Sequence, residues 1–146
     1  MYEAIDKFVT KYVAFTNDEL EIFHSYLKHK SVPKKTYLLQ EGEICDFEAY
    51  VNKGCIRNFY INQQGFEVIL QFAIEDWLVS DIASFNDQKP SKIYIETLED
   101  CELLMLSKKD KEELLEKIPK FERFFRIMVQ KNLSSTQNRL INTIAN

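Results

Sequence analysis

Apolar residues recur at helical spacing at both ends of the chain and follow a different pattern in between. The first series predicts a short amphipathic helix over residues 3–15, with one face formed by Ile5, Phe8, Val9, Tyr12 and Val13. Thr16 and Glu19 then have the spacing of a capping box, which marks the start of a second helix. We expect this second helix to continue to about Lys30, because Pro33 follows shortly after and cannot extend it.

From residue 36 to residue 107 the chain changes to short runs rich in β-branched and aromatic residues. Six of these runs predict strands, at residues 36–39, 49–52, 55–61, 68–74, 93–98 and 103–106. Turn sequences separate the runs, and the three glycines of the chain, Gly42, Gly54 and Gly65, lie in those turns, where a positive φ is most often needed. Many short strands at regular spacing favour a barrel or a sandwich.

Helical periodicity returns after residue 107. A short charged helix is predicted at residues 108–117, and residues 121–146 contain neither Gly nor Pro. At 1.5 Å per residue the last helix is roughly 39 Å long, more than the core of one small domain needs. We therefore divide the chain into a folded body, residues 1–120, and a terminal helix, residues 121–146, that pairs with a second copy through Phe125, Met128, Leu133, Leu140 and Ile144. The alternative is a helix that packs only on its own barrel.

The composition limits the kinds of protein that the chain can be. Its 146 residues are 45% hydrophobic, which is enough for one domain with its own core, and its formal net charge of −4 argues against binding of a nucleic-acid backbone by this chain alone. Cys45, Cys55 and Cys101 form no CxxC motif, which is typical of a reduced, cytoplasmic protein. With no signal peptide and no long apolar run, we expect neither secretion nor a membrane partner.

The residues that catalysis needs are scarce. Both histidines, His24 and His29, fall in the predicted second helix, and the strand region contains none. A cupin-like metal enzyme, the natural alternative for a small barrel, needs two or three histidines that face the barrel interior. Neither Cys45 nor Cys55 has a histidine placed beside it, and the nucleophile-elbow, P-loop and dinucleotide-binding motifs do not occur. We therefore expect a protein that is not an enzyme and holds no metal.

One polar segment, residues 77–92, interrupts the series of strands. It predicts a short helix that begins near Ser80 or Asp81. The free N–H groups and the dipole of such a helix favour an anion, to which Lys89 or Lys92 would add positive charge. The alternative is that Ser80 or Asp81 is an ordinary N-cap that stabilises the helix by about 1 kcal/mol and binds nothing.

The order of these elements resembles the cyclic-nucleotide-binding fold of Crp/Fnr-type bacterial transcription regulators. The resemblance covers essentially the whole chain and rests on the turn sequences around Gly42 and Gly54, the hairpin at Gly65, the segment 78–92 and the long last helix. It implies an α+β, mainly β fold: a double-stranded β-helix (jelly roll) with N-terminal helices and a long C-terminal dimerisation helix. It also implies a cytoplasmic homodimer, in which DNA is bound only by a helix-turn-helix domain that this chain does not include.

In that family the segment equivalent to 78–92 holds the phosphate of a cyclic nucleotide. The family's ligand-contacting positions fall here on Ser80, Asp81, Ile82, Ser91, Lys92, Thr136 and Gln137. Asp81 takes the place of a glutamate that binds the ribose, and Ser91 takes the place of the arginine that clamps the phosphate. Loss of a charged hydrogen bond of that kind costs about 1.5–3 kcal/mol.

Three functions remain open at this point. The chain is a sensor of a cyclic nucleotide, a sensor of another small anionic or apolar effector, or a dimerisation module with no ligand. We expect no further cofactor. The iron–sulfur cluster of the oxygen-sensing branch needs a group of cysteines near the N-terminus, and no cysteine precedes Cys45.

Overall fold

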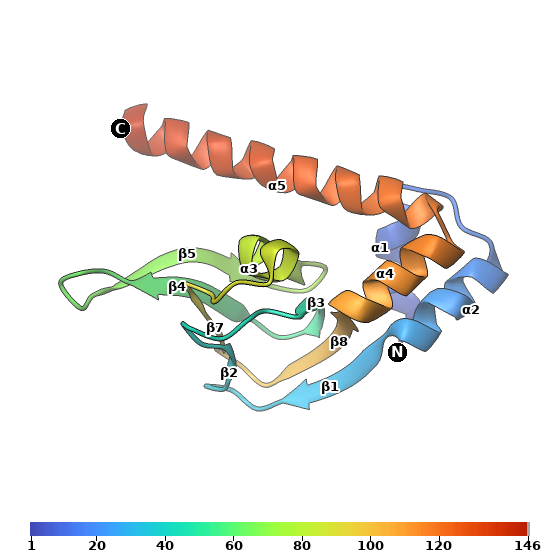
Figure 1. Ribbon diagram of the computed structural model, residues 1–146, viewed down its shortest axis with the longest axis horizontal. Helices are drawn as coiled ribbons and strands as arrows, with labels where there is room; N and C mark the ends of the chain where they lie inside the picture. The colour runs from blue at the N-terminus through green and yellow to red at the C-terminus, as the bar shows by residue number, and fades with distance from the viewer. Residues whose placement is uncertain (146) are drawn as a thin grey trace.

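Two four-stranded antiparallel sheets make up the body of the protein (Figure 1). The structure is a computed structural model that describes the backbone of residues 1–145 and the side chains of residues 1–133. Sheet A has the strand order β1 (Lys28–Val32), β8 (Cys101–Ser107), β3 (Phe47–Lys53) and β6 (Leu78–Val79). Sheet B has the strand order β2 (Tyr37–Leu39), β7 (Tyr94–Thr97), β4 (Ile56–Ile61) and β5 (Glu67–Ala73). The predicted mainly β fold, with helices before and after the jelly roll, is confirmed.

Five helices accompany the sheets in residues 1–145. They are α1 (Glu3–Thr10), α2 (Asn17–Tyr26), α3 (Ile82–Asp87), α4 (Lys108–Lys117) and α5 (Lys120–Ala145). Helices α1, α2 and α4 gather at one end of the molecule, and α5 extends from that end past α3 and β5 (Figure 1). The predicted capping box is confirmed at α2, where Thr16 Oγ1 accepts from the Glu19 N–H at 3.2 Å and Glu19 Oε1 accepts from the Thr16 N–H at 2.8 Å.

Sheet A is buried on both of its faces because β3 and β8 alternate between two hydrophobic cores. The face toward sheet B contributes to the roll core, which consists of Val32, Leu39, Cys45, Phe47, Ala49, Val51, Ile56, Ala73, Val79, Phe85, Ile95, Cys101 and Leu103. Phe85 comes from α3, so the predicted insert helix is anchored inside the roll. In a strand, side chains at odd and even positions lie on opposite faces, and Tyr50 and Leu104 accordingly lie on the other face.

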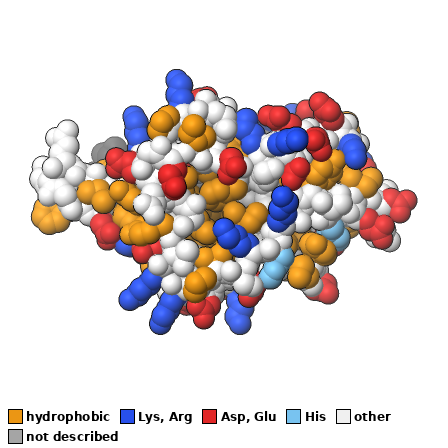
Figure 2. All heavy atoms as spheres, turned by 60° about the horizontal axis from the view of Figure 1, so that its bottom comes forward, with side chains coloured by type: hydrophobic (Ala, Val, Ile, Leu, Met, Phe, Trp, Pro, Cys, Tyr) orange, Lys and Arg blue, Asp and Glu red, His pale blue; other side chains and the backbone are white. Residues whose placement is uncertain are grey.

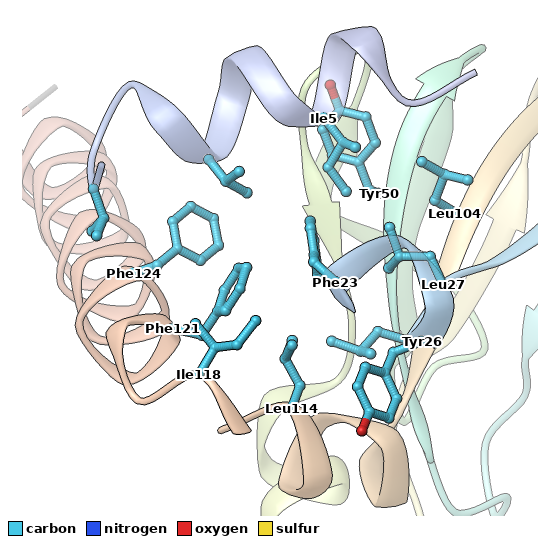
Figure 3. Packing of buried hydrophobic residues seen from close by; sticks show 13 residues of the cluster. Ile5, Phe23, Tyr26, Leu27, Tyr50, Leu104, Leu114, Ile118, Phe121 and Phe124 are labelled. Atoms are coloured by element: carbon cyan, nitrogen blue, oxygen red, sulfur yellow. The ribbon is translucent and has the colours of Figure 1, made fainter. Parts of the chain in front are cut away.

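The opposite face of sheet A is covered by helices (Figure 3). This helix core consists of Ile5, Val9, Val13, Phe23, Tyr26, Leu27, Tyr50, Leu104, Leu106, Leu114, Ile118, Phe121 and Phe124. Phe121 and Phe124 come from the first turns of α5, so the start of the long helix is part of the folded body. The Tyr50 hydroxyl donates a hydrogen bond to Asp76, and burial, followed by that bond, raises the pKa of Tyr50 well above its usual value.

The two N-terminal helices are shorter than the apolar spacing predicts. Helix α1 ends at Thr10 rather than at residue 15. At this end the Thr10 hydroxyl donates a hydrogen bond to the Asp6 carbonyl at 2.6 Å. Helix α2 ends at Tyr26 rather than near Lys30, because Leu27 is extended. Residues after it form β1, which pairs with β8 as an edge strand of sheet A. Propensity in a polar stretch is a weak signal, and pairing with a buried strand overrides it.

The position of His29 is therefore corrected. It lies in β1 and not in a helix, and its Nε2 lies 2.7 Å from Glu102 of β8. His24 remains in α2, where its Nε2 lies 2.6 Å from Asp6 Oδ1 and its ring stacks on Tyr2. Each histidine thus joins two neighbouring elements.

Two glycine substitutions test the turn assignments. A Cβ on Gly54, which has φ +119°, would lie 2.5 Å from Cys101 Sγ and 2.9 Å from the Asp100 carbonyl oxygen, whereas Gly65 has φ +86° and no atom within 4 Å of such a Cβ. We expect Gly54→Ala to lower the free energy of unfolding by more than about 2 kcal/mol, because clash adds to backbone strain, and Gly65→Ala by about 1 kcal/mol from strain alone. Urea unfolding at one fixed protein concentration measures both; equal losses would contradict the close approach at Gly54.

Candidate functional site

The insert, residues 77–92, is closed through the carboxylate of Asp81. Asp81 Oδ1 caps α3 by accepting a hydrogen bond from the Ser84 N–H at 3.2 Å. Its other oxygen, Oδ2, accepts a hydrogen bond from Ser91 Oγ at 2.6 Å. We call this Asp81–Ser91 hydrogen bond the latch, because it joins the two ends of the insert. The sequence analysis places both residues in the site, and the structure brings them into direct contact.

Ser91 is fixed from several sides. It is 3% exposed, and its N–H donates to the Glu43 carbonyl at 2.7 Å while its own carbonyl accepts from the Gly42 N–H at 2.8 Å. The Ser91 hydroxyl also accepts from the Ile93 N–H at 3.0 Å. The turn at Gly42, one of the motifs on which the family resemblance rests, therefore holds the residue that stands in place of the arginine.

The other hydroxyl groups of the insert bind the protein backbone. Ser84 Oγ donates to the Lys89 carbonyl at 2.6 Å and accepts from the Cys45 N–H at 2.9 Å. Ser80 Oγ donates to the Phe47 carbonyl at 2.9 Å, just where β3 begins. These bonds tie the start of α3 and the strand before it to sheet A. The groups that would approach a ligand thus have partners within the protein.

The charge at the latch is negative. Lys89 and Lys92 are exposed, and within residues 1–133 neither ammonium group has a hydrogen-bond or ion-pair partner. Ile82, the third residue of the family's first motif, is 39% exposed. With six residues, α3 is very short, and the Ser84 N–H at its N-terminal end is already capped by the Asp81 carboxylate. That carboxylate has no ion-pair partner among the described residues, so it would oppose an anion placed beside it.

The remaining predicted residues lie on α5. Thr136, Gln137, Leu140 and Ile144 have side chains outside the described residues. Phe125 and Met128 are partly buried against the helix core, so they serve the chain's own fold. Leu133 is 65% exposed and Val129 is 45% exposed, so this part of α5 presents apolar side chains to solvent.

A groove lies between the two edge strands β1 and β2, on the side of the molecule that Figure 2 shows. Its volume is about 570 Å³, and apolar residues such as Leu38, Ile44 and Met105 line it together with Lys28 and Lys30. Lys28 and Lys30 pair in register with Met105 and Leu103, so they lie on the inward face of an edge strand. Inward-facing charges on an edge strand oppose pairing with a further strand, and no residue of the insert lines the groove.

Sequence reasoning missed two polar residues that matter for the site. Ser84 fastens α3 to the segment before β3, and its only signal was a small polar residue within the predicted insert helix. Asn58 of β4 is 6% exposed, faces Gln71 across the strand pair, and has an Oδ1 atom with no partner among the described residues. Its signal was a single amide, next to Arg57, inside a run that is otherwise apolar and aromatic.

The described residues offer little to an enzyme mechanism. Burial raises the pKa of the Cys55 and Cys101 thiols, so both are less nucleophilic at neutral pH than an ordinary cysteine. No group of three or more potential metal ligands occurs in the part of the chain that the structure describes. Among the same residues, no helix has the length and apolar character to cross a membrane.

A model of one protein family matches most of the body described above. It is the cyclic nucleotide-binding domain, and it matches residues 29–118. The chain belongs to the cyclic nucleotide-binding domain family. No curated protein sequence matches the chain significantly. The matched residues include the strands of both sheets and the insert, so the latch lies within the part of the chain that the family model matches.

Solved structures of this family share the fold at low sequence identity. A cyclic nucleotide-binding domain from Methylobacillus flagellatus is 17% identical with a TM-score of 0.85, covering 97% of this chain and 83% of its own. The catabolite activator protein of Thermus thermophilus is 19% identical with a TM-score of 0.78, covering 93% of this chain and 62% of its own. The regulator CLP of Xanthomonas campestris, described as c-di-GMP responsive, is 17% identical with a TM-score of 0.70, covering 86% and 63%. This cyclic nucleotide-binding domain thus spans about six tenths of the length of the two regulators.

A double-mutant cycle measures the latch. We expect Ser91→Ala and Asp81→Ala each to lower the free energy of unfolding by about 1–3 kcal/mol, since each removes a hydrogen bond to a charged group and Asp81 is also an N-cap. The double variant should lose less than the sum of the two, because the latch is lost only once. Urea unfolding of the four proteins checks this, and strictly additive losses would mean that the two side chains do not interact.

Proposed function

We propose that this cyclic nucleotide-binding domain is the sensor and dimerisation part of a Crp/Fnr-type transcription regulator, and that it binds an effector without an arginine–phosphate clamp. Membership of the family and the fold shared with the catabolite activator protein support the sensor role. The long helix α5, with exposed Val129 and Leu133, supports dimerisation. The latch is the observation that carries the proposal on the effector.

The effector proposed here donates hydrogen bonds to Asp81. The Ser91 hydroxyl is the donor that satisfies Oδ2 of this carboxylate. A hydroxyl or amine group of an effector competes for the same oxygen, whereas a cyclic phosphate would meet Ser91 in place of the arginine and find no bidentate cation there. Asn58 Oδ1, buried on the inner face of sheet B and without a described partner, is a second acceptor for such a ligand. Release of the Ser91 hydroxyl then removes the bond that joins the two ends of the insert, and the population shifts to an open insert.

A dimerisation module with no ligand is the second candidate. The saturated hydrogen bonds of the insert favour it, because Ser80, Ser84 and Ser91 all have protein partners. The two candidates share the dimer and differ in whether the insert opens. A variant such as Ser91→Ala, which frees Asp81 Oδ2, should raise the affinity for a donor ligand, whereas in a module without a ligand it would lower the stability and create no binding.

Cyclic nucleotides test the effector proposal directly. We expect neither cyclic AMP nor cyclic GMP to give a saturable shift of the thermal midpoint of the wild type. The titration extends to about 1 mM nucleotide, a typical upper limit for such a measurement. Ligand at about 100 times Kd stabilises a native state by roughly 2.7 kcal/mol, which moves the midpoint by several degrees. Asp81→Glu/Ser91→Arg, which restores the two family side chains, should show a saturable shift. A saturable shift of the wild type at micromolar nucleotide would contradict the proposal.

Dimerisation has its own test. We expect sedimentation equilibrium of the wild type to give twice the mass of the 17.3 kDa chain. Leu133→Glu places a charge on an exposed apolar part of α5 and should weaken the dimer at least tenfold, since burying an unpaired charge is costly. Lys109→Glu, at an exposed site on α4, is the matched control and should leave the dimer unchanged. A wild type that stays monomeric at high concentration would overturn the dimer assignment.

A further inference from the structure

We propose that Lys111 of α4 couples the insert to α5, so that opening of the insert is transmitted to the long helix. This inference deepens the proposed function and rests on it in one respect, namely that the insert is the input and α5 the output. Lys111 lies outside every motif of the sequence analysis. It carries the proposal because its ammonium group contacts three other elements at once.

The contacts of the ammonium group come from α3, α5 and β3. Lys111 Nζ lies 5.2 Å from the centre of the Phe85 ring of α3 and 4.1 Å from the centre of the Phe125 ring of α5. It also forms an ion pair with Glu48 Oε1 of β3 at 3.0 Å. Both ring distances lie within the range of about 6 Å in which a cation is attracted to an aromatic face.

The ion pair holds the ammonium group at a site that is largely shielded from solvent. The Lys111 side chain is 17% exposed and the Glu48 side chain 15% exposed. Glu48 Oε2 is buried with no partner among the described residues, and Glu48 lines a small cavity of about 20 Å³ together with Phe124 and Phe125. Among the described residues Lys111 is the cation that pairs with Glu48, so it cannot leave the site at low cost. Its ammonium group can shift only between the Phe85 ring and the Phe125 ring.

The two rings lie on the two elements that the proposal couples, Phe85 on α3 and Phe125 on α5. Phe85 is 3% exposed and sits three residues after Ile82, the first residue of α3, so it moves with the helix that Asp81 caps. Phe125 lies on the first turns of α5 and is partly buried against the helix core. A displacement of α3 that withdraws Phe85 leaves Phe125 as the remaining ring for Nζ. The insert and α5 are therefore coupled through a shared cation, and couplings of this kind typically change an equilibrium five- to 150-fold.

Hydrogen exchange in the ligand-free full chain tests the coupling without any effector. The reporters are the Phe85 and Gln88 amides of α3, which donate to the Asp81 and Ser84 carbonyls at 2.8 Å and 2.7 Å. Phe125→Leu removes the ring on α5 and leaves Phe85 as the remaining ring for Lys111 Nζ, so it should lower exchange of these amides at least threefold relative to β3 amides. Phe124→Leu is the matched control, because the neighbouring Phe124 ring contacts Phe8 and Phe125 rather than Lys111; it should leave the ratio unchanged.

A background without the charges distinguishes the shared cation from general loosening. Lys111→Met alone would leave Glu48 buried and unpaired, so the background variant is Glu48→Met/Lys111→Met, in which an apolar pair of similar volume replaces the ion pair. In this background Phe125→Leu should no longer change the exchange of the Phe85 and Gln88 amides relative to that of β3 amides. In a Lys111→Arg background, which keeps a cation, Phe125→Leu should still change it.

Two results would overturn the coupling: an unchanged or raised exchange of the α3 amides relative to β3 in Phe125→Leu, or the same decrease with and without the charges. Neither result depends on a dimer or on a ligand. Failure of the nucleotide or sedimentation tests, in contrast, would count against the proposed function and leave this coupling in place.

Discussion

Strands β3 and β8 must each bury side chains on both faces, and the arrangement of the other elements depends on this constraint. Ala49 and Val51 face the roll core, while Tyr50 between them faces the helix core. The helices therefore cannot be an addition to an independent jelly roll, because sheet A would expose Tyr50, Leu104 and Leu106 without them. The start of α5 is bound into the same layer through Phe121 and Phe124. Burial of this kind stabilises a domain by about 25 cal/mol for each Å² of apolar surface removed from water.

The same sheet positions the insert. Ser80 and Ser84 bind backbone groups at or just before β3, and Phe85 is buried in the roll core. On the helix side, Glu48 of β3 binds Lys111 of α4. Residues at or beside β3 thus contact both the insert and α4, and Lys111 of α4 in turn contacts α5. In the proposed coupling, a change at Asp81 reaches the long helix through Phe85 and Lys111.

Local signals in the sequence were sufficient for the elements whose stability is local. The capping box at Thr16, the strands from 49 to 106 that alternate with turns, and the helix that begins after Asp81 follow from residues within a few positions of one another. Strand β1 was missed because its sequence, Lys-His-Lys-Ser-Val, is almost entirely polar and is extended only through pairing with β8. His29 was misplaced for the same reason.

The chemistry of the site was predictable only in part. The resemblance identified Asp81 and Ser91 as site residues, but their mutual hydrogen bond joins positions ten residues apart and depends on the turn at Gly42. The part played by Lys111 needs four elements to meet in space, and no spacing along the chain indicates it. Long-range polar contacts of this kind are set by tertiary structure, so a sequence pattern cannot reveal them.

The insert is closed by its own residues, through the hydrogen bond between Ser91 and Asp81. A high-resolution crystal structure of the domain, grown without nucleotide, is the sharpest test of this closure. We expect a Ser91 Oγ to Asp81 Oδ2 distance near 2.6 Å, with no anion between the two side chains. Separated side chains, with Lys92 turned inward over a bound anion, would contradict it.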